Sequence, residues 1–360
     1  MGATEFTLNH PLAVQRWSTS LAHEAEKLQY FRKFMGTGPE NLIVVKTELN
    51  KAAGEKITVG LRMKLTGDGV EGDNIIEGTS AETPLDFFYD AVFIDQRRKG
   101  TKSKGKMSEQ RVPYNLREEG RNALAIWYAE DYDEQIMMYL AGARGIDTSF
   151  HVALGYTGRA SNAFSAPTTV ICGGDATSLA DIAEADKMKL TLVERLVAKA
   201  ETYDPAIQPF SIGGEKKFVL LMHTYQAYDL RTTISQNDWV DVQKAVGDRG
   251  GKNLLYQNAL GEYADVILHK HRNVIRFDST TGCGAGITAA RALFMGAQAL
   301  MVAWGGGSAY GRYAWNEETD DRGNALAITA GCIYGVKKSV FNAKDFGLFA
   351  VDTYCADPNA

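Results

Sequence analysis

Residues 57–65, Ile57-Thr-Val-Gly-Leu-Arg-Met-Lys-Leu65, place an apolar side chain at every second position. A period of two is typical of a β-strand with one buried face. A stretch with four glycines and Pro84 follows, and strand pairing is not expected to persist through it. Residues 85–96 are rich in the aromatic and β-branched side chains that suit a returning strand. The segment 51–106 is therefore predicted to form a long β-hairpin.

This hairpin has no obvious partner within its own chain. A two-stranded hairpin on its own is at best marginally stable in water, so one of this length must lie against another surface. A second copy of the same chain is one such surface. The hairpin therefore favours a protein that assembles with itself, before any enzyme motif is considered.

Charge is sharply segregated along the hairpin. Residues 66–96 hold eight acidic side chains and no Lys or Arg, and residues 97–106 hold six basic side chains and no acid. One interpretation is two solvated surfaces that keep an exposed strand edge from sticking. A second is complementary ends, in which the acidic tip of one subunit meets basic surface on a neighbour and fixes the register between subunits. A nucleic-acid contact by the basic run is a third.

The composition is that of an ordinary soluble protein. The chain has 360 residues, 45% hydrophobic and 23% charged, with a net charge of −5, which gives no sign of tight nucleic-acid binding. The four cysteines are widely spaced and are expected to be reduced and mostly buried. No signal peptide is recognised, and no stretch approaches the roughly 20 apolar residues of a membrane helix.

Helices and strands are mixed without a regular βαβ alternation, which predicts an α+β fold. The expected helices cover 18 or 20 to 35, 113–140, 187–203, a segment that begins at 237 or 238, and 287–297. The longest, 113–140, would span roughly 40 Å. The expected strands cover 218–222, 266–268, 274–277, 299–304, 325–334 and 347–351. Residues 305–321 are expected to form an exposed loop.

No catalytic, cofactor or metal site is predicted. Gly282-Cys-Gly-Ala-Gly286 lacks the spacing of a dinucleotide loop and is expected to join a strand to a helix. His269 and His271 point the same way if they lie on one strand, yet no third metal ligand is suggested nearby. Known catalytic signatures for serine, zinc or cysteine chemistry are missing from the sequence.

With these segments in view, the chain resembles the major capsid proteins of tailed bacteriophages, and among them the family typified by the N-four-like podophages. The resemblance is carried by short stretches in one consistent order: Pro11-Leu-Ala-Val-Gln-Arg-Trp17-Ser18, Phe34-Met-Gly36, Gly54-Glu-Lys-Ile-Thr-Val59, Glu77-Gly78, Val92-Phe-Ile-Asp-Gln96, Met107-Ser-Glu-Gln-Arg111 and Gly261-Glu-Tyr263.

The resemblance implies the Hong-Kong-ninety-seven-like capsid fold. Its parts would be an N-arm at 1–50, an E-loop hairpin at 51–106, a P-domain at 107–224 with the spine helix 113–140, an A-domain at 225–325, and C-terminal strands at 326–360 that return to the P-domain. The residues expected at contacts between subunits are Trp17, Asp68, Glu71, Asp73, Glu77, Arg97, Arg98 and Lys99.

The function that follows is a structural one: hexamers and pentamers that close into an icosahedral phage head around double-stranded DNA. The expected partners are further copies of the chain, a portal, a decoration protein, packaged DNA on the inner face, and a scaffolding protein encoded separately, since no long helical prefix precedes the hairpin. Two alternatives stay open at this stage, an encapsulin-type compartment shell and a soluble oligomeric enzyme.

Overall fold

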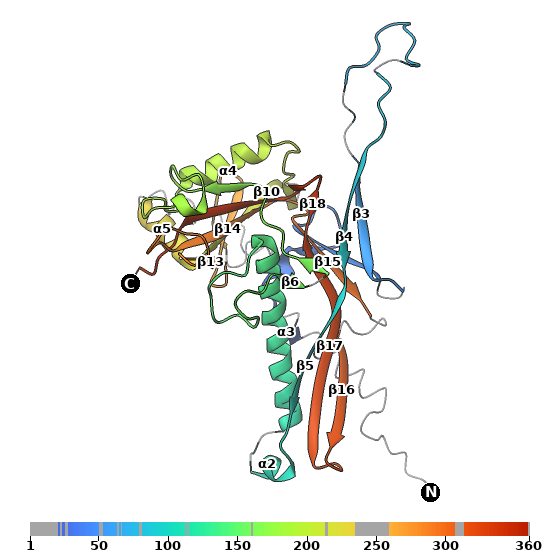
Figure 1. Ribbon diagram of the computed structural model, residues 1–360, viewed down its shortest axis with the longest axis vertical. Helices are drawn as coiled ribbons and strands as arrows, with labels where there is room; N and C mark the ends of the chain where they lie inside the picture. Colours follow the sequence, from blue (N-terminus) through green and yellow to red (C-terminus); the bar gives the residue numbers. More distant parts are fainter. Residues whose placement is uncertain are drawn as a thin grey trace.

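The computed structural model describes residues 21, 24–25, 28–49, 53–62, 65, 67–78, 81–111, 113, 115–159, 161–212, 215–234, 259–306 and 313–358. Trp17 and the helix expected from 237 or 238 lie outside these residues. Figure 1 shows two sheets on either side of a long central helix, α3 (Leu116–Ala141), with a hairpin that projects beyond both. The predicted α+β class is confirmed.

The spine helix α3 begins where its sequence provides a cap. The Asn115 side chain accepts a hydrogen bond from the Arg117 backbone nitrogen at 3.1 Å, so the helix starts at Leu116 rather than at the expected residue 113. It ends at Gly142, whose backbone is left-handed with φ 66°. A Cβ atom there would lie 2.3 Å from the Ser165 carbonyl oxygen, so the close approach of this loop requires glycine.

The first sheet lies along the helix. In the described residues its order is β1-β2-β15-β17-β16, with β5 on the other edge of β17. The strands are β1 (Met35–Gly36), β2 (Ile43–Leu49), β5 (Asp95–Lys102), β15 (Leu300–Gly305), β16 (Tyr313–Asp320) and β17 (Ala325–Lys338). Strands β5, β17 and β16 extend as a long ribbon beside the first half of α3 (Figure 1).

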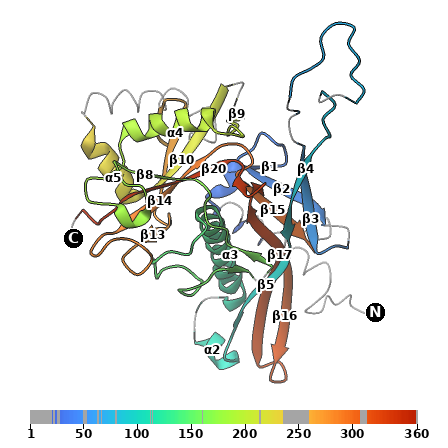
Figure 2. The ribbon, with the colours of Figure 1, turned by 45° about the horizontal axis from the view of Figure 1, so that its top comes forward.

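The second sheet is covered on both faces. Its main order is β11-β12-β10-β14-β20-β8, with β9 beside β10 and β13 beside β14. The strands are β8 (Val170–Cys172), β9 (Phe210–Ile212), β10 (Glu215–His223), β11 (Ala259–Tyr263), β12 (Val266–His271), β13 (Arg276–Phe277), β14 (Ala289–Met295) and β20 (Leu348–Tyr354). Helices α4 (Leu190–Thr202) and α5 (Thr224–Thr233) pack on one face and the end of α3 on the other, as Figure 2 shows for α4 and α5.

The remaining elements are short. They are the 3-10 turns η1 (Phe31–Phe34) and η2 (Leu179–Asp181), helix α2 (Lys106–Gln110), and the strand pairs β6 (Gly158–Arg159) with β7 (Asn162–Ala163) and β18 (Val340–Phe341) with β19 (Lys344–Asp345).

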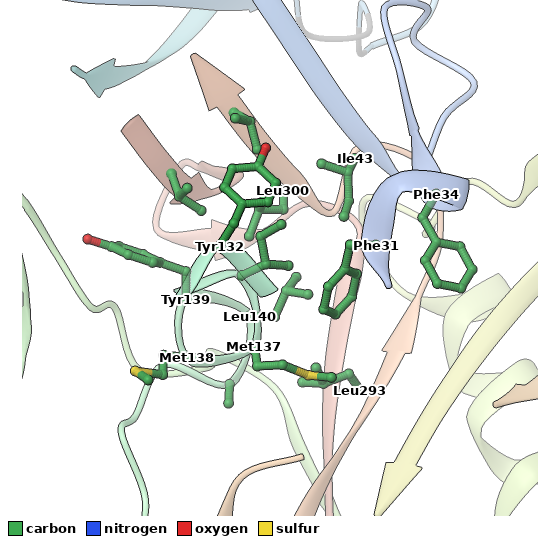
Figure 3. Packing of buried hydrophobic residues seen from close by; sticks show 14 of the residues in the cluster. Phe31, Phe34, Ile43, Tyr132, Met137, Met138, Tyr139, Leu140, Leu293 and Leu300 are labelled. Atoms are coloured by element: carbon green, nitrogen blue, oxygen red, sulfur yellow. The ribbon is translucent and has the colours of Figure 1, made fainter. Parts of the chain in front are cut away.

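The main core joins the N-terminal segment to the second half of α3. Figure 3 shows Phe31 and Ile43 beside Leu140 and Met137 of the helix, with Phe34 beyond Phe31 and further from the helix. Leu21, Ala25 and Phe31 are buried on this core, but Leu28 is exposed. The helical path gives way to η1 before residue 35, so the arm helix ends earlier than predicted.

Three expected segments are different in the structure. Residues 287–297, expected as a helix, contain strand β14, which is fully buried between β10 and β20 and so lacks the alternation that marks a strand. Part of the expected loop 305–321 is strand β16, with Tyr313, Trp315 and Glu317 facing inward. The glycines at 282–286 consequently precede a strand and not a helix.

The expected domain boundaries do not follow the two sheets. Strands β17 and β20, expected to return together to the P-domain, lie in different sheets. Strand β15 belongs to the sheet along the spine helix, although its residues were expected in the A-domain segment 225–325. Helix α4 and strand β10, expected in the segment 107–224, belong to the second sheet. The sheet to which each strand belongs is decided by pairing with strands far away in the sequence. Domains drawn as continuous residue ranges therefore do not coincide with the sheets.

Candidate assembly surfaces

The hairpin is formed by β3 (Lys56–Arg62) and β4 (Phe87–Phe93), which pair antiparallel from Lys56 opposite Phe93 to Arg62 opposite Phe87. The predicted alternation is confirmed in β3, where residue 57 is buried and 59 and 61 are half-buried while their neighbours are exposed. Residues opposite each other in such a pair point to the same face. The hairpin therefore has an inner face and an outer face.

The inner face anchors the root of the hairpin to its own subunit. Ile57 and Val92 form a small core with Met301 and Ala303 of β15. The buried Asp90 carboxylate forms an ion pair with Lys337 and accepts a hydrogen bond from the Val340 backbone nitrogen at 3.1 Å. Asp90 is one of the eight acidic residues of segment 66–96, and it does not belong to a solvated tip.

Asn162 fixes the last residue of the hairpin. Its side-chain oxygen accepts from the Phe93 nitrogen at 3.1 Å, and its side-chain nitrogen donates to the Phe93 oxygen at 2.7 Å. Tyr139 of the spine helix in turn donates to the Asn162 carbonyl oxygen at 2.6 Å. The direction in which the hairpin leaves the subunit is therefore set by the spine helix.

The outer face and the tip of the hairpin present large apolar side chains to solvent. Phe87 and Tyr89 are 64% and 79% exposed on β4, and at the tip Ile75 and Ile76 are 77% and 53% exposed. Gly60, opposite Tyr89, offers no side chain to cover the ring. Burying one such side chain is worth about 1.5–3 kcal/mol. A concentration of exposed apolar side chains on one projection marks an interaction surface.

The tip is also strongly acidic. Asp68, Glu71, Asp73 and Glu77, expected at subunit contacts, are all exposed on the projecting loop. Within the described residues none of these four carboxylates has a basic partner, and the Asp68 carboxylate accepts a hydrogen bond only from the Gly69 nitrogen, at 3.0 Å. The structure brings these four residues together on a loop that its own subunit does not cover.

The three basic residues expected beside them are separated by the structure. Arg97 points toward α3, forms an ion pair with the fully buried Asp131, and lies over the Trp127 ring at 5.3 Å. Burial raises the pKa of the Asp131 carboxyl, and the Arg97 guanidinium opposes that rise. Arg98 and Lys99 are exposed, with Lys99 on the same face of β5 as Arg97 and its ammonium 5.5 Å from the Trp127 ring. The charge of Arg97 therefore acts within the subunit, and Arg98 and Lys99 remain as candidates for a contact with a neighbour.

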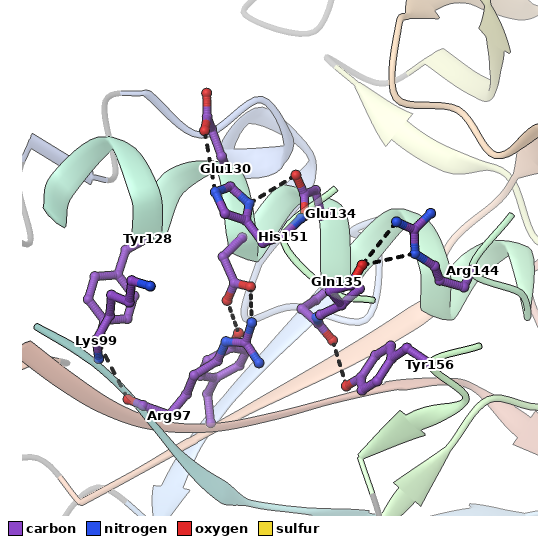
Figure 4. A network of polar contacts seen from close by, with 12 residues as sticks. Arg97, Lys99, Tyr128, Glu130, Glu134, Gln135, Arg144, His151 and Tyr156 are labelled. Carbon is purple, nitrogen blue, oxygen red and sulfur yellow. Dashed lines mark hydrogen bonds and ion pairs between the residues drawn. The ribbon is translucent and has the colours of Figure 1, made fainter. Parts of the chain in front are cut away.

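Strand β5, which presents Arg98 and Lys99, is firmly held. Tyr128 of α3 donates a hydrogen bond to the Ala330 carbonyl oxygen of β17 and accepts one from the Lys99 nitrogen at 3.2 Å. About two helical turns further on, the His151 Nδ1 atom lies 3.0 Å from a Glu134 carboxylate oxygen, and Tyr156 donates a hydrogen bond to Gln135 at 3.3 Å (Figure 4). Tyr128 thus fixes the basic strand to the spine helix, and Glu134 and Gln135 attach the loop that follows the helix.

The N-terminal segment is attached to the same helix through Asp133. Its buried carboxylate accepts hydrogen bonds from the Tyr30 nitrogen at 2.7 Å and the Phe31 nitrogen at 3.3 Å. Burial outweighs these hydrogen bonds and raises the pKa of Asp133 from 3.8 to about 7. The adjacent Glu134, whose pKa is also raised by burial, adds to the rise.

This pKa predicts a pH dependence. The folded chain holds the proton of Asp133 more tightly than the unfolded chain, so the stability it contributes is fully present below the unfolded pKa and is lost as the pH rises through about 7. We expect the free energy of unfolding of unassembled subunits, measured in urea, to fall between pH 5 and pH 8 by roughly 2.7 kcal/mol more in the parent chain than in Asp133→Asn, since about two pKa units lie in this range. Parallel pH curves for the two proteins would contradict the assignment.

Sites for chemistry are scarce in the described part of the chain. No group of three His, Cys, Asp or Glu side chains in it is arranged to hold a metal ion. His269 lies against Phe34, with its Nδ1 atom 3.4 Å from Lys33 Nζ, and the His271 ring contacts the Tyr30 ring at a tilt of 47°, so the two histidines pack against the N-terminal segment. None of the helices in the described residues could cross a membrane.

The base of the hairpin is anchored to its own subunit, and its projecting part, with exposed apolar and acidic side chains, is left uncovered. These features suit a subunit that assembles with further copies of itself. Comparison with known proteins identifies the assembly. The sequence profile of the phage capsid protein family matches residues 5–357, and the chain belongs to that family.

Individual relatives agree with this membership. The chain is 26% identical over 364 residues to the major capsid protein of Pseudomonas phage KPP25, covering 93% of each protein. The capsid structure of Ralstonia phage GP4 superposes with a TM-score of 0.85 at 38% identity over 100% of both chains. The capsid subunit of cyanophage Pam1 gives a TM-score of 0.71 at 21% identity, over 99% of this chain and 96% of that one.

These comparisons confirm the predicted Hong-Kong-ninety-seven-like fold and the prediction of a structural phage capsid protein rather than an enzyme. Neither the encapsulin-type compartment nor the oligomeric enzyme finds support among the relatives. The sequence does not indicate which charged side chains are buried or paired within the subunit. The burial of Asp90 and the pairing of Arg97 with Asp131 depend on residues 247 and 34 positions away, which no local pattern signals.

Proposed function

We propose that the chain is the repeating subunit of an icosahedral phage head, arranged as hexamers and pentamers around double-stranded DNA. The observation that carries this proposal is the projecting hairpin, whose exposed Phe87, Tyr89 and Ile75 have no cover on their own subunit. In a closed shell each hairpin lies over a neighbour, and the apolar area becomes buried. Stability then depends on assembly and on subunit concentration.

The parts of the subunit take roles accordingly. The segment before β2 is the N-arm, the hairpin β3–β4 is the E-loop, α3 with the ribbon β5-β17-β16 is the P-domain, and the second sheet with α4 and α5 is the A-domain. We propose that assembly takes place in the host cytoplasm, with a portal and a separate scaffolding protein as partners. Packaged DNA would lie on the inner face.

Electron microscopy of the purified, concentrated protein tests the proposal. We expect capsomers, tubes or shells to form. A chain that remains monomeric at all concentrations and ionic strengths, with the hairpin protected from protease, would be incompatible with it.

The distribution of charge suggests which surface of an adjacent subunit the hairpin tip contacts. We propose that the acidic tip lies near Arg98 and Lys99 of an adjacent subunit. Replacing both by Glu, and leaving Arg97 and its pair with Asp131 intact, should raise the concentration needed for assembly about tenfold, since each exposed ion pair is worth roughly 0.2–1 kcal/mol and reversal adds repulsion. Light scattering across a concentration series measures this, and high salt should reduce the effect.

The matched control is Lys189→Glu with Lys199→Glu, which makes the same change of charge on exposed residues of the second sheet's helix region. This control should assemble like the parent chain. If the Arg98 and Lys99 variant forms intact shells that fail to retain DNA, the basic strand faces the genome and not a neighbouring hairpin.

A further inference from the structure

A pocket beside the second sheet lies on the side of the molecule away from the hairpin. It is formed by the loop that follows α3, the first residues of α5 and the turn between β12 and β13 (Figure 1). Its volume is about 320 Å³, which is at the lower end of the range for sites that bind small molecules. We call it the junction pocket. Its lining consists of Asp147, Ser149, Phe150, His223, Thr224, Tyr225, Arg272, Asn273 and Arg276.

Hydrogen-bond donors predominate in the junction pocket. The Arg272 side chain is exposed and has no carboxylate partner among the described residues, and its Nε atom donates to Asn273 Oδ1 at 3.1 Å. This bond engages the oxygen of the Asn273 side chain and leaves its amide nitrogen as a donor. Thr224 adds an exposed hydroxyl group. The lining can therefore donate several hydrogen bonds to a bound molecule.

The one carboxylate in the lining is already paired. Asp147 accepts hydrogen bonds from Nε of Arg276, at 3.4 Å, and from its Nη2. The Nη1 atom of Arg276 has no hydrogen-bond partner within the described residues, so it keeps two N–H donors. Two guanidinium groups thus face one carboxylate, and the pocket carries a net positive charge.

His223 does not add to this charge. Burial, with a smaller effect of the Arg276 charge, lowers its pKa to about 4, so the ring is neutral at pH 7. Its Nδ1 atom accepts a hydrogen bond from the Tyr225 backbone nitrogen at 3.2 Å and caps α5. Because this cap occupies the start of the helix, the two arginines and not the helix end must attract an anion.

A third guanidinium lies behind the pocket wall. Arg144 is buried, with its guanidinium carbon 4.7 Å from the centre of the Phe150 ring. It donates to the carbonyl oxygens of Val152, at 3.2 and 2.9 Å, and of Gly145, at 3.3 Å, and forms no ion pair in the described part of the chain. A buried charge without a counter-ion is costly. An anion in the adjacent pocket would reduce that cost.

The donors suit a phosphate group. A phosphate monoester carries a charge of about −1.5 to −2 at pH 7 and has three strong acceptor oxygens. Guanidinium groups bind such oxygens in pairs, and donors from a turn and a helix can approach them from different sides. A carboxylate has one charge and two oxygens, and would leave part of the donor set without a partner.

We propose that the junction pocket binds a phosphate group, held by Arg272 and by Nη1 of Arg276, with Asn273 and Thr224 as further donors. The bound group connects the β12–β13 turn to the start of α5. Two sources can supply it, a free nucleotide and a DNA strand. This inference goes beyond the proposed shell function, because it concerns a site within a single subunit.

Isothermal titration calorimetry on the full-length, unassembled subunit at pH 7 tests the proposal. The probes are inorganic phosphate, deoxyadenosine monophosphate, deoxyadenosine, and a single-stranded oligothymidylate without terminal phosphates. We expect inorganic phosphate and the monophosphate each to bind at one site per chain, and deoxyadenosine not to bind. An oligothymidylate that displaces inorganic phosphate identifies DNA as the source, and one that does not identifies a free nucleotide. Absence of binding by both phosphate probes would overturn the site.

Variants separate a built site from diffuse attraction. Arg272→Gln removes an exposed charge and should weaken phosphate binding about tenfold, since a hydrogen bond to a charged group is lost. Thr224→Val keeps the charge and should weaken it about threefold. The matched control, Arg322→Gln, changes an exposed arginine in the turn between β16 and β17 and should bind like the parent.

The melting temperatures of all three variants without ligand should match that of the parent chain, because no buried contact is removed. Equal phosphate affinities for Arg272→Gln and Arg322→Gln would show that net charge alone attracts the anion, and would exclude the site. Since the titration uses unassembled subunits, its failure would leave the shell function standing, and a failure to assemble would leave this site standing.

Discussion

Replacing Phe87 and Tyr89 together by Ser should abolish shell formation at concentrations where the parent chain assembles fully. The two rings lie on the outer face of the hairpin and are 64% and 79% exposed in the single subunit. If a neighbour covers both, their removal costs about 3–6 kcal/mol per contact at 1.5–3 kcal/mol for each side chain. Since 1.4 kcal/mol corresponds to a factor of ten, the assembly threshold should rise by at least about 100-fold. Sedimentation and electron microscopy across a concentration series measure this shift.

The loss should come from assembly and not from folding. Neither ring belongs to the core that anchors the hairpin root, so the far-UV circular dichroism and the melting temperature of the unassembled subunit should match the parent. The conservative pair Phe87→Leu with Tyr89→Phe keeps the outer face apolar and should still form shells. Normal assembly of the Ser variant would show that this face remains open in the shell and would remove the main support for the proposed function.

The hairpin is the part of the fold that the sequence predicts best, because its signal is local. The alternation in β3 is a property of neighbouring residues, and the glycines between the arms mark the place where pairing stops. The spine helix is similarly local, although its first residue is decided by Asn115 and not by Pro113. When the hydrophobic pattern of an element depends only on its own residues, as in the hairpin and the spine helix, the sequence predicts its bounds nearly correctly.

Strand β14 shows where such signals fail. Every residue from Ala289 to Met295 is buried, so the segment has neither the period of a strand nor that of an amphipathic helix. The segment is rich in alanine and leucine, and the high helix propensity of these residues favours a helix. The neighbours β10 and β20 override this preference by pairing with both edges, a tertiary effect that no window of the sequence contains.

The candidate contact residues also fall into those whose exposure follows from local sequence and those whose environment depends on distant residues. Asp68, Glu71, Asp73 and Glu77 are exposed because the loop that carries them projects, which follows from the glycine-rich sequence. In the sequence, charge alone groups Arg97 with Arg98 and Lys99. Alternation along β5 turns Arg97 toward the helix and Arg98 away from it, and the structure then adds the partner, Asp131, that a count of charges cannot show.

A buried ion pair connects the second sheet to the spine helix and should dominate the stability of the subunit. Arg291 of β14 donates to both carboxylate oxygens of Asp352 on β20, at 2.8 and 2.7 Å, and also to the Ala141 carbonyl oxygen at the end of α3, at 3.0 Å. Asp352 is fully buried. A charge left without its partner in such a place costs about 3–5 kcal/mol. That is a large fraction of the 5–15 kcal/mol by which proteins are typically stable.

Asp352→Asn should therefore lower the free energy of unfolding of the unassembled subunit by about 3–5 kcal/mol, measured by urea denaturation. Glu201→Gln on the exposed side of α4 removes the same charge and should change it by less than about 0.5 kcal/mol. The double variant Arg291→Met with Asp352→Leu removes both charges, and its stability should recover most of the loss because no unpaired charge remains. If Asp352→Asn is as stable as Glu201→Gln, Arg291 must find compensation elsewhere. If instead the double variant is the less stable protein, the guanidinium's bond to Ala141 contributes more than the pair, and the connection between helix and sheet depends on Arg291 alone.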